Sequence, residues 1–288
     1  MGVSQRNYIA GQPEIVQDMS KQQDIKLMIS DLDGTLLNSA GELPSEIFDL
    51  IPALRKAGVY FAIATGRQYS NIRALFGPVA QELIYITQNG SFVKTPTQDD
   101  FYPLDKALLK EMLDVANTLS EVYPILFSND IGYVLKPDGR FLQTLEKHTI
   151  FYEVVEDLYE TIQRIDMARF TIRDYMDTEK NSYARLYAQF SDRAKVTMAN
   201  HEWMDIVSKG VNKGVAVAQL QQELGISKAQ TMVFGDFDND IEMMSQAEYS
   251  YAIGNASEPV KKAARFLAKT NDEKGVIRVI EEYFGGKL

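Results

Sequence analysis

The sequence predicts an α/β protein: a Rossmann-like, doubly wound parallel sheet with an inserted α+β domain. Nearly continuous apolar runs alternate with helical patterns at both ends of the chain, as expected for a parallel sheet covered on both faces. The middle of the chain is more polar and shows a hairpin-and-helix pattern. With 288 residues, the chain is long enough for two domains.

These patterns divide the chain into three parts. Residues 1–24 are polar and lack periodicity, so we expect a flexible N-terminal tail there. We expect residues 25–90 and 205–288 to form the core domain. Residues 91–204 are then an insertion, which we expect to form a cap domain.

Four elements are predicted in the first part of the core. Residues 25–30, 59–65 and 83–87 are apolar runs of strand length. Residues 44–57 place their apolar side chains on one helical face, and Gly58 follows as a stop signal. This alternation of strands and helices predicts parallel pairing of the strands.

The same alternation returns near the end of the chain, whereas the insert differs. In the final part we predict helices over residues 215–224, 240–247, 259–267 and 275–284, and strands over residues 231–234 and 249–253. In the insert, residues 105–119 have the pattern of an amphipathic helix. Residues 132–135 and 183–190 alternate in the manner of strands.

The composition excludes several classes of protein. No apolar stretch approaches the roughly 20 residues of a membrane-spanning helix, and the N-terminus lacks the apolar core of a signal peptide. The formal net charge of -10 argues against nucleic acid as a partner, because a phosphate backbone requires a basic surface. The absence of cysteine excludes disulfides and thiolate sites. We therefore expect a cytoplasmic enzyme that acts on a small molecule.

Polar side chains follow three of the predicted core strands, at the point where each strand ends. Asp31 and Asp33 follow the first strand, and Thr65, Gly66 and Arg67 follow the second. An acidic cluster at residues 235–240 follows the strand at 231–234. Because ligands of open parallel sheets bind beyond the carboxyl ends of the strands, we expect these clusters to converge on one crevice.

Aspartates from two strand ends form the type of site that suits Mg²⁺, which prefers carboxylate oxygens and often bridges to a substrate phosphate. Such an ion would offset the repulsion between Asp31 and Asp33 and lower their pKa values. A phosphate would need further partners. Thr65, the backbone N–H groups after Asp31, and Lys213 at the start of a predicted helix can supply them.

Together these residues resemble a haloacid dehalogenase (HAD) superfamily phosphatase of the Cof type, subfamily IIB with the C2B cap. The resemblance extends over residues 25–284. The order and spacing of five segments carry it. They are Asp31-Leu32-Asp33-Gly34-Thr35, Ala64-Thr65-Gly66-Arg67, Asn89-Gly90, Gly210-Val211-Asn212-Lys213-Gly214 and Gly235-Asp236-Phe237-Asp238-Asn239-Asp240.

The resemblance implies catalytic roles for four residues. Asp31 would be the nucleophile and would form an aspartyl-phosphate. Asp33 would protonate the leaving alkoxide and then deprotonate the attacking water. Thr65 would donate a hydrogen bond to the phosphoryl group, and Lys213 would pair with Asp31 and the phosphate. Two other interpretations remain open: Thr65 as a cap of the next helix, and Lys213 as an ordinary solvated helix residue.

The resemblance also implies a metal site and a substrate site. Mg²⁺ would be held by Asp31, by the backbone carbonyl of Asp33, and by Asp236, with Asn239 and Asp240 completing or orienting the site. The implied substrate-binding residues are Thr65, Gly66, Arg67, Asn89, Lys213 and Asn239. For Arg67 and Asn89, substrate contact and a purely loop-fixing role remain equally open.

The predicted function is hydrolysis of a small phosphorylated metabolite by a Mg²⁺-dependent phosphatase, through an aspartyl-phosphate. Sugar phosphates, pyridoxal phosphate and molecules related to flavin mononucleotide are the implied substrate classes. Two alternatives remain: a phosphomutase that passes the phosphoryl group to a second hydroxyl, and a non-catalytic phosphometabolite-binding protein. The sequence leaves a monomer and a homodimer equally open.

Overall fold

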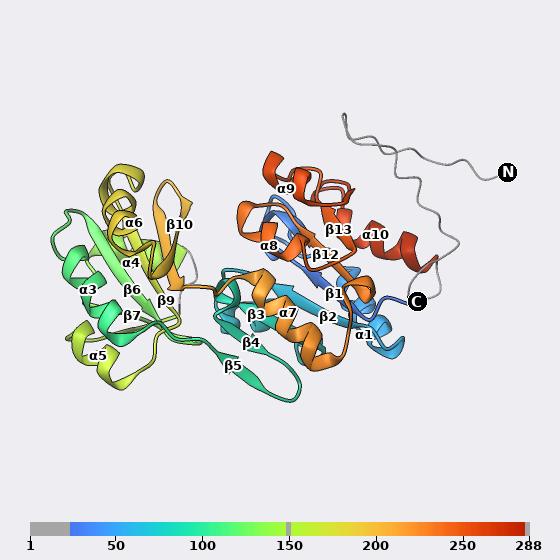
Figure 1. The fold of residues 1–288 in the computed structure, drawn as a ribbon, viewed down its shortest axis with the longest axis horizontal. Coiled ribbons are helices and arrows are strands. Elements are labelled where there is room, and N and C mark those ends of the chain that lie inside the picture. The colour runs from blue at the N-terminus through green and yellow to red at the C-terminus, as the bar shows by residue number, and fades with distance from the viewer. Residues whose placement is uncertain (1–23, 148–150, 286–288) are drawn as a thin grey trace. The chain divides into compact units, whose positions relative to one another are not determined.

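The computed structural model describes residues 24–147 and 151–285 (Figure 1), and the predicted N-terminal tail thus lies almost entirely outside the described residues. Contacts within the chain separate two compact units. Of the described residues, 24–63 and 217–285 belong to the first unit, and 64–147 and 151–216 belong to the second.

A parallel sheet forms the centre of the first unit. Its strands lie in the order β14-β13-β12-β1-β2, and every neighbouring pair is parallel. In chain order the strands are β1 (Leu27–Ser30), β2 (Tyr60–Ala64), β12 (Thr231–Gly235), β13 (Tyr249–Ala252) and β14 (Phe266–Leu267). All residues of β1 and β12 are buried, which explains their largely apolar character.

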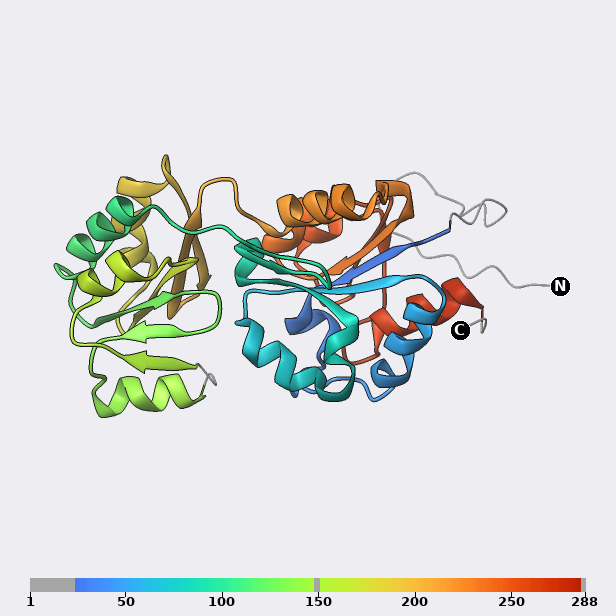
Figure 2. The same cartoon turned by 90° about the horizontal axis from the view of Figure 1, so that it is seen from below.

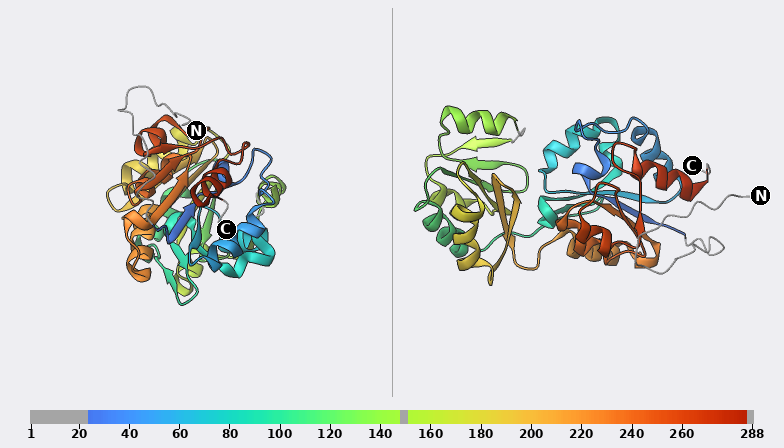
Figure 3. Two further views of the ribbon diagram at one scale, coloured as in Figure 1. Left: turned by 90° about the vertical axis from the view of Figure 1, so that its right-hand side faces the viewer. Right: turned by 90° about the horizontal axis from the view of Figure 1, so that it is seen from above.

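Helices and short turns connect these strands. They are η2 (Leu32–Leu36), α1 (Ile47–Lys56), α7 (Lys213–Leu224), η6 (Lys228–Gln230), η7 (Asp238–Asp240), α8 (Ile241–Met244), α9 (Glu258–Ala263) and α10 (Gly275–Phe284). The helix α7 begins in the second unit and continues into the first. The helix α10, coloured red, lies beside the blue segment that carries β1 and η2 (Figures 1 and 3).

One predicted helix of the first unit is partly wrong. We expected a helix over residues 259–267, but α9 ends at Ala263 and β14 follows. Ala264 has an extended backbone, and Phe266 then pairs with Tyr251 of β13. The rings of these two aromatic residues are stacked at 5.1 Å. Strand pairing and ring stacking therefore override the helical pattern at the end of this segment.

The second unit contains a group of three antiparallel strands and a larger group of strands that forms a separate mixed sheet. The strands β3 (Leu83–Thr87), β4 (Phe92–Lys94) and β5 (Asp99–Phe101) are antiparallel neighbours. Beside them in sequence are α2 (Tyr69–Phe76), η3 (Gly77–Glu82) and η4 (Gln88–Gly90). The predicted cap boundary at residue 91 thus falls immediately before β4.

The larger sheet has six strands in the order β10-β11-β9-β6-β7-β8. Its strands are β6 (Val122–Phe127), β7 (Gly132–Val134), β8 (Tyr152–Val154), β9 (Arg169–Asp174), β10 (Ala194–Asn200) and β11 (Trp203–Ser208). One face packs against α3 (Lys106–Ala116), α5 (Leu158–Arg164) and α6 (Ala184–Phe190) in a shared hydrophobic core (Figure 2). The helix α4 (Gly139–Lys147) packs in a second cluster with Phe127 and Trp203.

The strand predicted over residues 183–190 is wrong, because this segment forms the helix α6. Leu186 and Phe190 are both buried, and this spacing places them on one helical face. Tyr183 and Tyr187 have the same spacing, with ring centroids 5.2 Å apart. Over so short a segment, the apolar pattern fits both the strand period of two residues and the helical period of about 3.6 residues. Packing against the six-stranded sheet selects the helix.

Candidate active site

The carboxyl ends of β1 and β12 place two of the predicted acidic segments side by side. Ser30 is opposite Phe234 of β12 and opposite Ile63 of β2, so all three parallel strands end at the same edge. The N–H of Asp31 donates to the carbonyl of Phe234 at 2.9 Å. The strand β2 pairs with one edge of β1, and β12 pairs with the other edge. This is the switch point at which doubly wound sheets bind ligands.

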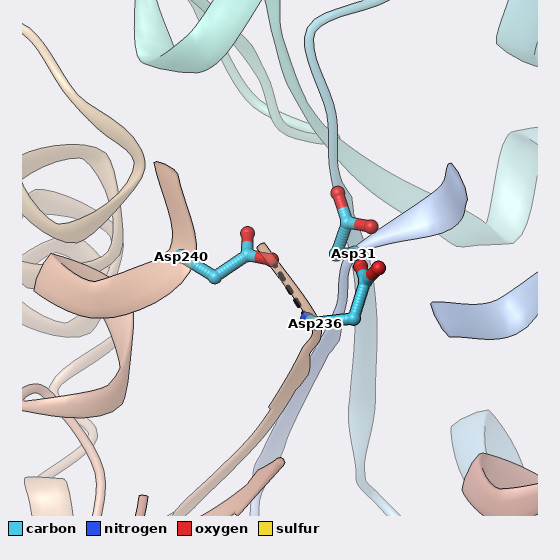
Figure 4. Close-up of side chains that lie close together, drawn as sticks. All are labelled: Asp31, Asp236 and Asp240. Atoms are coloured by element: carbon cyan, nitrogen blue, oxygen red, sulfur yellow. Dashed lines mark hydrogen bonds between the residues drawn. The ribbon is translucent and has the colours of Figure 1, made fainter. Parts of the chain in front are cut away.

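Three aspartates meet at this edge. Asp31, Asp236 and Asp240 each offer a carboxylate oxygen, and these oxygens all lie within 4.8 Å of one another. Figure 4 shows the carboxylates of Asp31 and Asp236 next to each other, with Asp240 turned toward the backbone of Asp236. Asp31 is only 5% exposed and Asp240 is fully buried. We call these residues the acidic triad.

Hydrogen bonds fix two members of the acidic triad. The hydroxyl of Thr35 donates to Oδ1 of Asp236 at 2.8 Å. Oδ2 of Asp240 accepts from the N–H groups of Asp236 at 3.0 Å and Phe237 at 3.2 Å. Asp240 therefore holds the turn that carries Asp236. Thr35 was not among the predicted site residues, although its position directly after Asp33-Gly34 places it in the same turn.

Two glycines allow this close approach. A Cβ at Gly34 would lie 2.3 Å from Oδ2 of Asp236, and Gly34 has a φ of +79°. A Cβ at Gly235 would lie 2.6 Å from the Cβ of Asp240. Neither space is available to a larger residue, because real Cβ atoms do not approach other atoms so closely. The glycines in both segments are therefore required by the geometry around the carboxylates.

The acidic triad fits a hard divalent cation. Carboxylate oxygens gathered within a few ångströms are the ligands that Mg²⁺ and Ca²⁺ prefer, and the histidine or cysteine ligands typical of zinc sites are not among them. Of the other predicted metal residues, Asp33 is exposed and Asn239 is half-buried in η7. Neither side chain belongs to the acidic triad, and for Asp33 only the backbone carbonyl was expected to bind the ion.

In the second unit, two loops bring several predicted substrate residues together. Thr65 is buried, and its N–H donates to the carbonyl of Ile86 in β3 at 2.8 Å. The N–H of Asn89 donates to the carbonyl of Thr65 at 3.0 Å. The amide of Asn89 lies against Gly66, where an added Cβ would be 3.4 Å away. The loops after β2 and β3 are therefore packed on each other.

Thr65 does not act as the N-cap of the following helix. Helix α2 begins at Tyr69, and its N-cap residue is Gln68. The hydroxyl of Thr65 instead accepts a hydrogen bond from the N–H of Arg67 at 3.2 Å. The structure thus rules out the helix-cap interpretation and leaves the Thr65 side chain bonded within its own loop.

The loop after β3 is strained and lies against the start of α7. Gln88 and Asn89 have φ values of +50° and +57°, which non-glycine residues rarely adopt. Gly90 follows with a φ of +99°, and a Cβ there would lie 2.6 Å from the carbonyl oxygen of Asn212. The next residue, Lys213, begins α7 and is fully buried. A fully buried lysine does not fit the interpretation of an ordinary solvated helix residue.

The family of the chain follows from its sequence match. Residues 28–280 match the model of the haloacid dehalogenase-like hydrolases. The chain belongs to this family. The predicted Cof-type haloacid dehalogenase fold, a Rossmann-like α/β core with a cap, is thereby confirmed.

Relatives of this haloacid dehalogenase-like hydrolase extend over nearly its whole length. A 5-amino-6-(5-phospho-D-ribitylamino)uracil phosphatase, YbjI of Escherichia coli, is 29% identical over 90% of this chain and 96% of its own. YitU of Bacillus subtilis has the same name and is 27% identical over 90% of this chain and 97% of its own. A crystal structure of a protein from Eubacterium rectale superimposes with a TM-score of 0.84 at 28% identity, over 91% of this chain and 100% of its own.

The predicted enzyme class, a phosphatase of the haloacid dehalogenase superfamily, is confirmed by these comparisons. Within the part of the chain that the structure describes, no helix has both the length and the apolar character needed to cross a membrane.

Two glutamines near the strand-end loops were missed by the sequence analysis. The amide of Gln68 donates to the carbonyl of Asp130 at 2.8 Å, and that of Gln88 donates to the carbonyl of Asn129 at 2.9 Å. The guanidinium of Arg169 in β9 donates to the carbonyl of Gly66 at 2.9 Å. These bonds connect the loops after β2 and β3 to the larger sheet of the second unit. No local pattern marks such pairings, because the partners are far apart in the sequence.

Proposed function

We propose that this hydrolase is a Mg²⁺-dependent phosphatase that cleaves a small phosphorylated metabolite through an aspartyl-phosphate on Asp31. The acidic triad supports the proposal most directly, because its oxygens lie within 4.8 Å of one another at the carboxyl ends of β1 and β12. A carboxylate nucleophile replaces one difficult displacement by two easier ones. That division matters because phosphate monoesters are among the slowest compounds to hydrolyse.

In the first step, a carboxylate oxygen of Asp31 attacks phosphorus and the bond from phosphorus to the ester oxygen breaks. Asp33 gives its proton to the departing alkoxide. In the second step, Asp33 takes a proton from water, and the water oxygen attacks the phosphorus of the aspartyl-phosphate. Inorganic phosphate leaves and the Asp31 carboxylate is restored. General acid and base catalysis by one residue requires that it change protonation state between the two steps.

Further residues would bind the phosphoryl group and the metal. We propose that Thr65 and Lys213 bind phosphoryl oxygens, and that Gly66, Arg67, Asn89 and Asn239 contact the substrate. Asp31, Asp236 and the backbone carbonyl of Asp33 would hold Mg²⁺, with Asn239 and Asp240 completing or orienting the site. The ion would neutralise phosphoryl charge that otherwise repels an anionic nucleophile.

The substrate proposal starts from the relatives. YbjI and YitU are both named as phosphatases of 5-amino-6-(5-phospho-D-ribitylamino)uracil, a primary phosphate ester of a sugar alcohol chain. We therefore place this compound first in a panel that also contains hexose phosphates, pyridoxal phosphate and flavin mononucleotide. We further propose that residues 91–204 form a cap that excludes bulk water, and that the protein acts in the cytoplasm as a monomer or homodimer.

Release of inorganic phosphate tests the proposal. Wild-type protein with Mg²⁺ should hydrolyse p-nitrophenyl phosphate and at least one member of the panel, and EDTA should abolish both activities until Mg²⁺ is restored. The Asp31→Asn variant should lose at least about a thousandfold in kcat, as expected when a catalytic nucleophile is removed. Its melting temperature should stay close to that of the wild type.

Two results would contradict this function. Normal turnover by Asp31→Asn would show that Asp31 is not the nucleophile. A phosphate release that is replaced by transfer to an added sugar phosphate would instead identify a phosphomutase.

A further inference from the structure

We propose that Asn255 and Asn271 are positioning residues that hold the turn carrying Asp33. Both side chains lie in the first unit and bind backbone carbonyls of the segment just after β1. The inference rests on the acid and base role proposed for Asp33, and it adds two residues that lie outside the predicted site.

The turn after β1 has bonding partners both inside and outside itself. It spans Leu32–Leu36 and is closed by the N–H of Leu37, which donates to the carbonyl of Leu32 at 2.9 Å. Inside it, Asp33 has φ −79° and ψ 117°, and Gly34 has φ +79° and ψ −3°. These non-helical angles turn the carbonyl groups away from any helical ladder and leave them open to partners outside the turn.

Two asparagine amides supply those partners. Nδ2 of Asn255 donates to the carbonyl of Gly34 at 2.8 Å, and Nδ2 of Asn271 donates to the carbonyl of Leu37 at 2.9 Å. The two asparagines are also joined, because Oδ1 of Asn255 accepts from the N–H of Asn271 at 3.0 Å. Asn255 thus uses both its donor and its acceptor, which an amide provides and a carboxylate does not.

These hydrogen bonds hold the backbone that directly follows Asp33 in the sequence. The Gly34 carbonyl belongs to the peptide that links Gly34 to Thr35, and the Thr35 hydroxyl binds Asp236. The peptide is therefore tied to Asn255 at its oxygen and to the acidic triad through the Thr35 side chain. Asp33 itself is exposed and lines a cavity of about 500 Å³, together with Asn255 and Asn271. Because Asp33 is exposed on that side, the hydrogen bonds of the turn help to hold its backbone in place.

A loss of Asn255 should therefore impair protonation of the leaving group more than attack on phosphorus. Phenyl phosphate releases a phenolate about as basic as a tyrosine side chain, with a pKa of about 10, and needs the acid. The p-nitrophenolate ion is a much weaker base and leaves with little help. Asn255→Ala should lower kcat/KM for phenyl phosphate about tenfold more than for p-nitrophenyl phosphate, the effect of one lost hydrogen bond. The KM values should change little.

The chain offers a matched control. Asn38 lines the same cavity, but its side chain accepts from the N–H groups of Ala40 and Glu42 and does not bind the carbonyls of Gly34 or Leu37. Asn38→Ala should leave both kcat/KM values within about twofold of the wild type. Asn255→Asp is a second test variant, because it keeps the acceptor for Asn271 and loses only the donor to Gly34. It should reproduce the selective loss seen for Asn255→Ala.

A double-mutant cycle separates this inference from the function on which it rests. Asp33→Asn alone should lose phenyl phosphate hydrolysis selectively; if it does not, the acid role of Asp33 is wrong. If it does, Asn255→Ala should have almost no further effect on phenyl phosphate in the Asp33→Asn background. An additive loss, an equal loss on both substrates, or an Asn38→Ala variant as impaired as Asn255→Ala would overturn the positioning role.

Discussion

Gly34, in the turn after β1, lies directly against the carboxylate of Asp236 in the acidic triad. The backbone at Gly34 has φ +79°, and that at Gly41 has φ +78°, so any other residue would be strained at either position. They differ in their surroundings. A Cβ at Gly34 would meet the Asp236 carboxylate at 2.3 Å, whereas a Cβ at Gly41 would meet nothing within 4 Å. A comparison of alanine variants at these two glycines therefore distinguishes the effect of backbone strain from the effect of displacing a carboxylate.

Gly34→Ala should weaken metal binding, and Gly41→Ala should not. Both variants should lose about 1 kcal/mol of unfolding free energy from the left-handed backbone. Only the added methyl group of Gly34→Ala must push Asp236 aside. We therefore expect the affinity of the Gly34→Ala variant for Mg²⁺ or Mn²⁺ to fall at least about tenfold. Calorimetric titration of the metal, with urea unfolding in EDTA as the stability measurement, checks both expectations. Equal metal affinities for the two variants would show that Asp236 does not bind the ion.

At the scale of single elements, β3 is fully buried, is anchored by its Tyr85, and is followed by the strained loop Gln88–Gly90. Its Tyr85 is 2% exposed and packs edge-on against Tyr69 of α2, with ring centroids 5.0 Å apart. The Tyr85 hydroxyl donates to the carbonyl of Ala80 in η3. Burial, with a smaller contribution from Tyr69, raises the pKa of Tyr85 far above its usual range. The strand thus depends on a phenol that stays neutral.

The stability of the protein should therefore respond to high pH through Tyr85. In the unfolded chain this phenol ionises near pH 10, whereas in the folded chain it stays protonated. Its contribution is fully present below pH 10 and is lost as the pH rises above that value. Tyr85→Phe should cost about 1 kcal/mol at pH 7, because the Ala80 carbonyl loses its donor, and it should then lose less stability than wild type between pH 9 and 11. Urea unfolding at these pH values measures both effects, and parallel losses in the two proteins would contradict the assignment.

At the scale of the whole molecule, local sequence signals correctly predicted the elements whose tertiary packing agrees with their local sequence pattern. The strand β3 over Leu83–Thr87 and the helix α10 over Gly275–Phe284 have the predicted bounds, because continuous apolarity and clear helical periodicity each allow one structure. The segments 183–190 and 264–267 were predicted wrongly because their conformation depends on long-range packing: α6 packs on a sheet, and β14 pairs with β13.

The same distinction applies to the site. The rule that strand ends converge predicted that Asp31 and Asp236 lie together, since it needs only the strand order. Local sequence did not predict the bonds from Asn255 and Asn271 to the turn after β1, or those from Gln68 and Gln88 to residues 129 and 130. Such bonds depend on the register between distant loops, which a motif does not encode.

A metal ion bound by the acidic triad should stabilise the folded protein, because its ligands come from both the N-terminal and the C-terminal sequence segments of the first unit. At a Mg²⁺ concentration of one hundred times Kd, binding to the folded state alone adds about 2.7 kcal/mol. The melting temperature should then rise by roughly 5 to 10 °C. Asp236→Asn should abolish this rise. Asp272→Asn should keep it, because Asp272 binds Ser39 and does not belong to the triad.

Thermal unfolding of the three proteins, each with EDTA and with Mg²⁺, provides the measurement. The comparison uses the shift caused by the ion in each protein, so a change in the stability of a metal-free variant does not affect it. A rise of equal size in Asp236→Asn and wild type would locate the ion outside the triad. A rise that disappears in Asp272→Asn would move the metal site toward the cavity beside Asp33, because Asp272 lines that cavity.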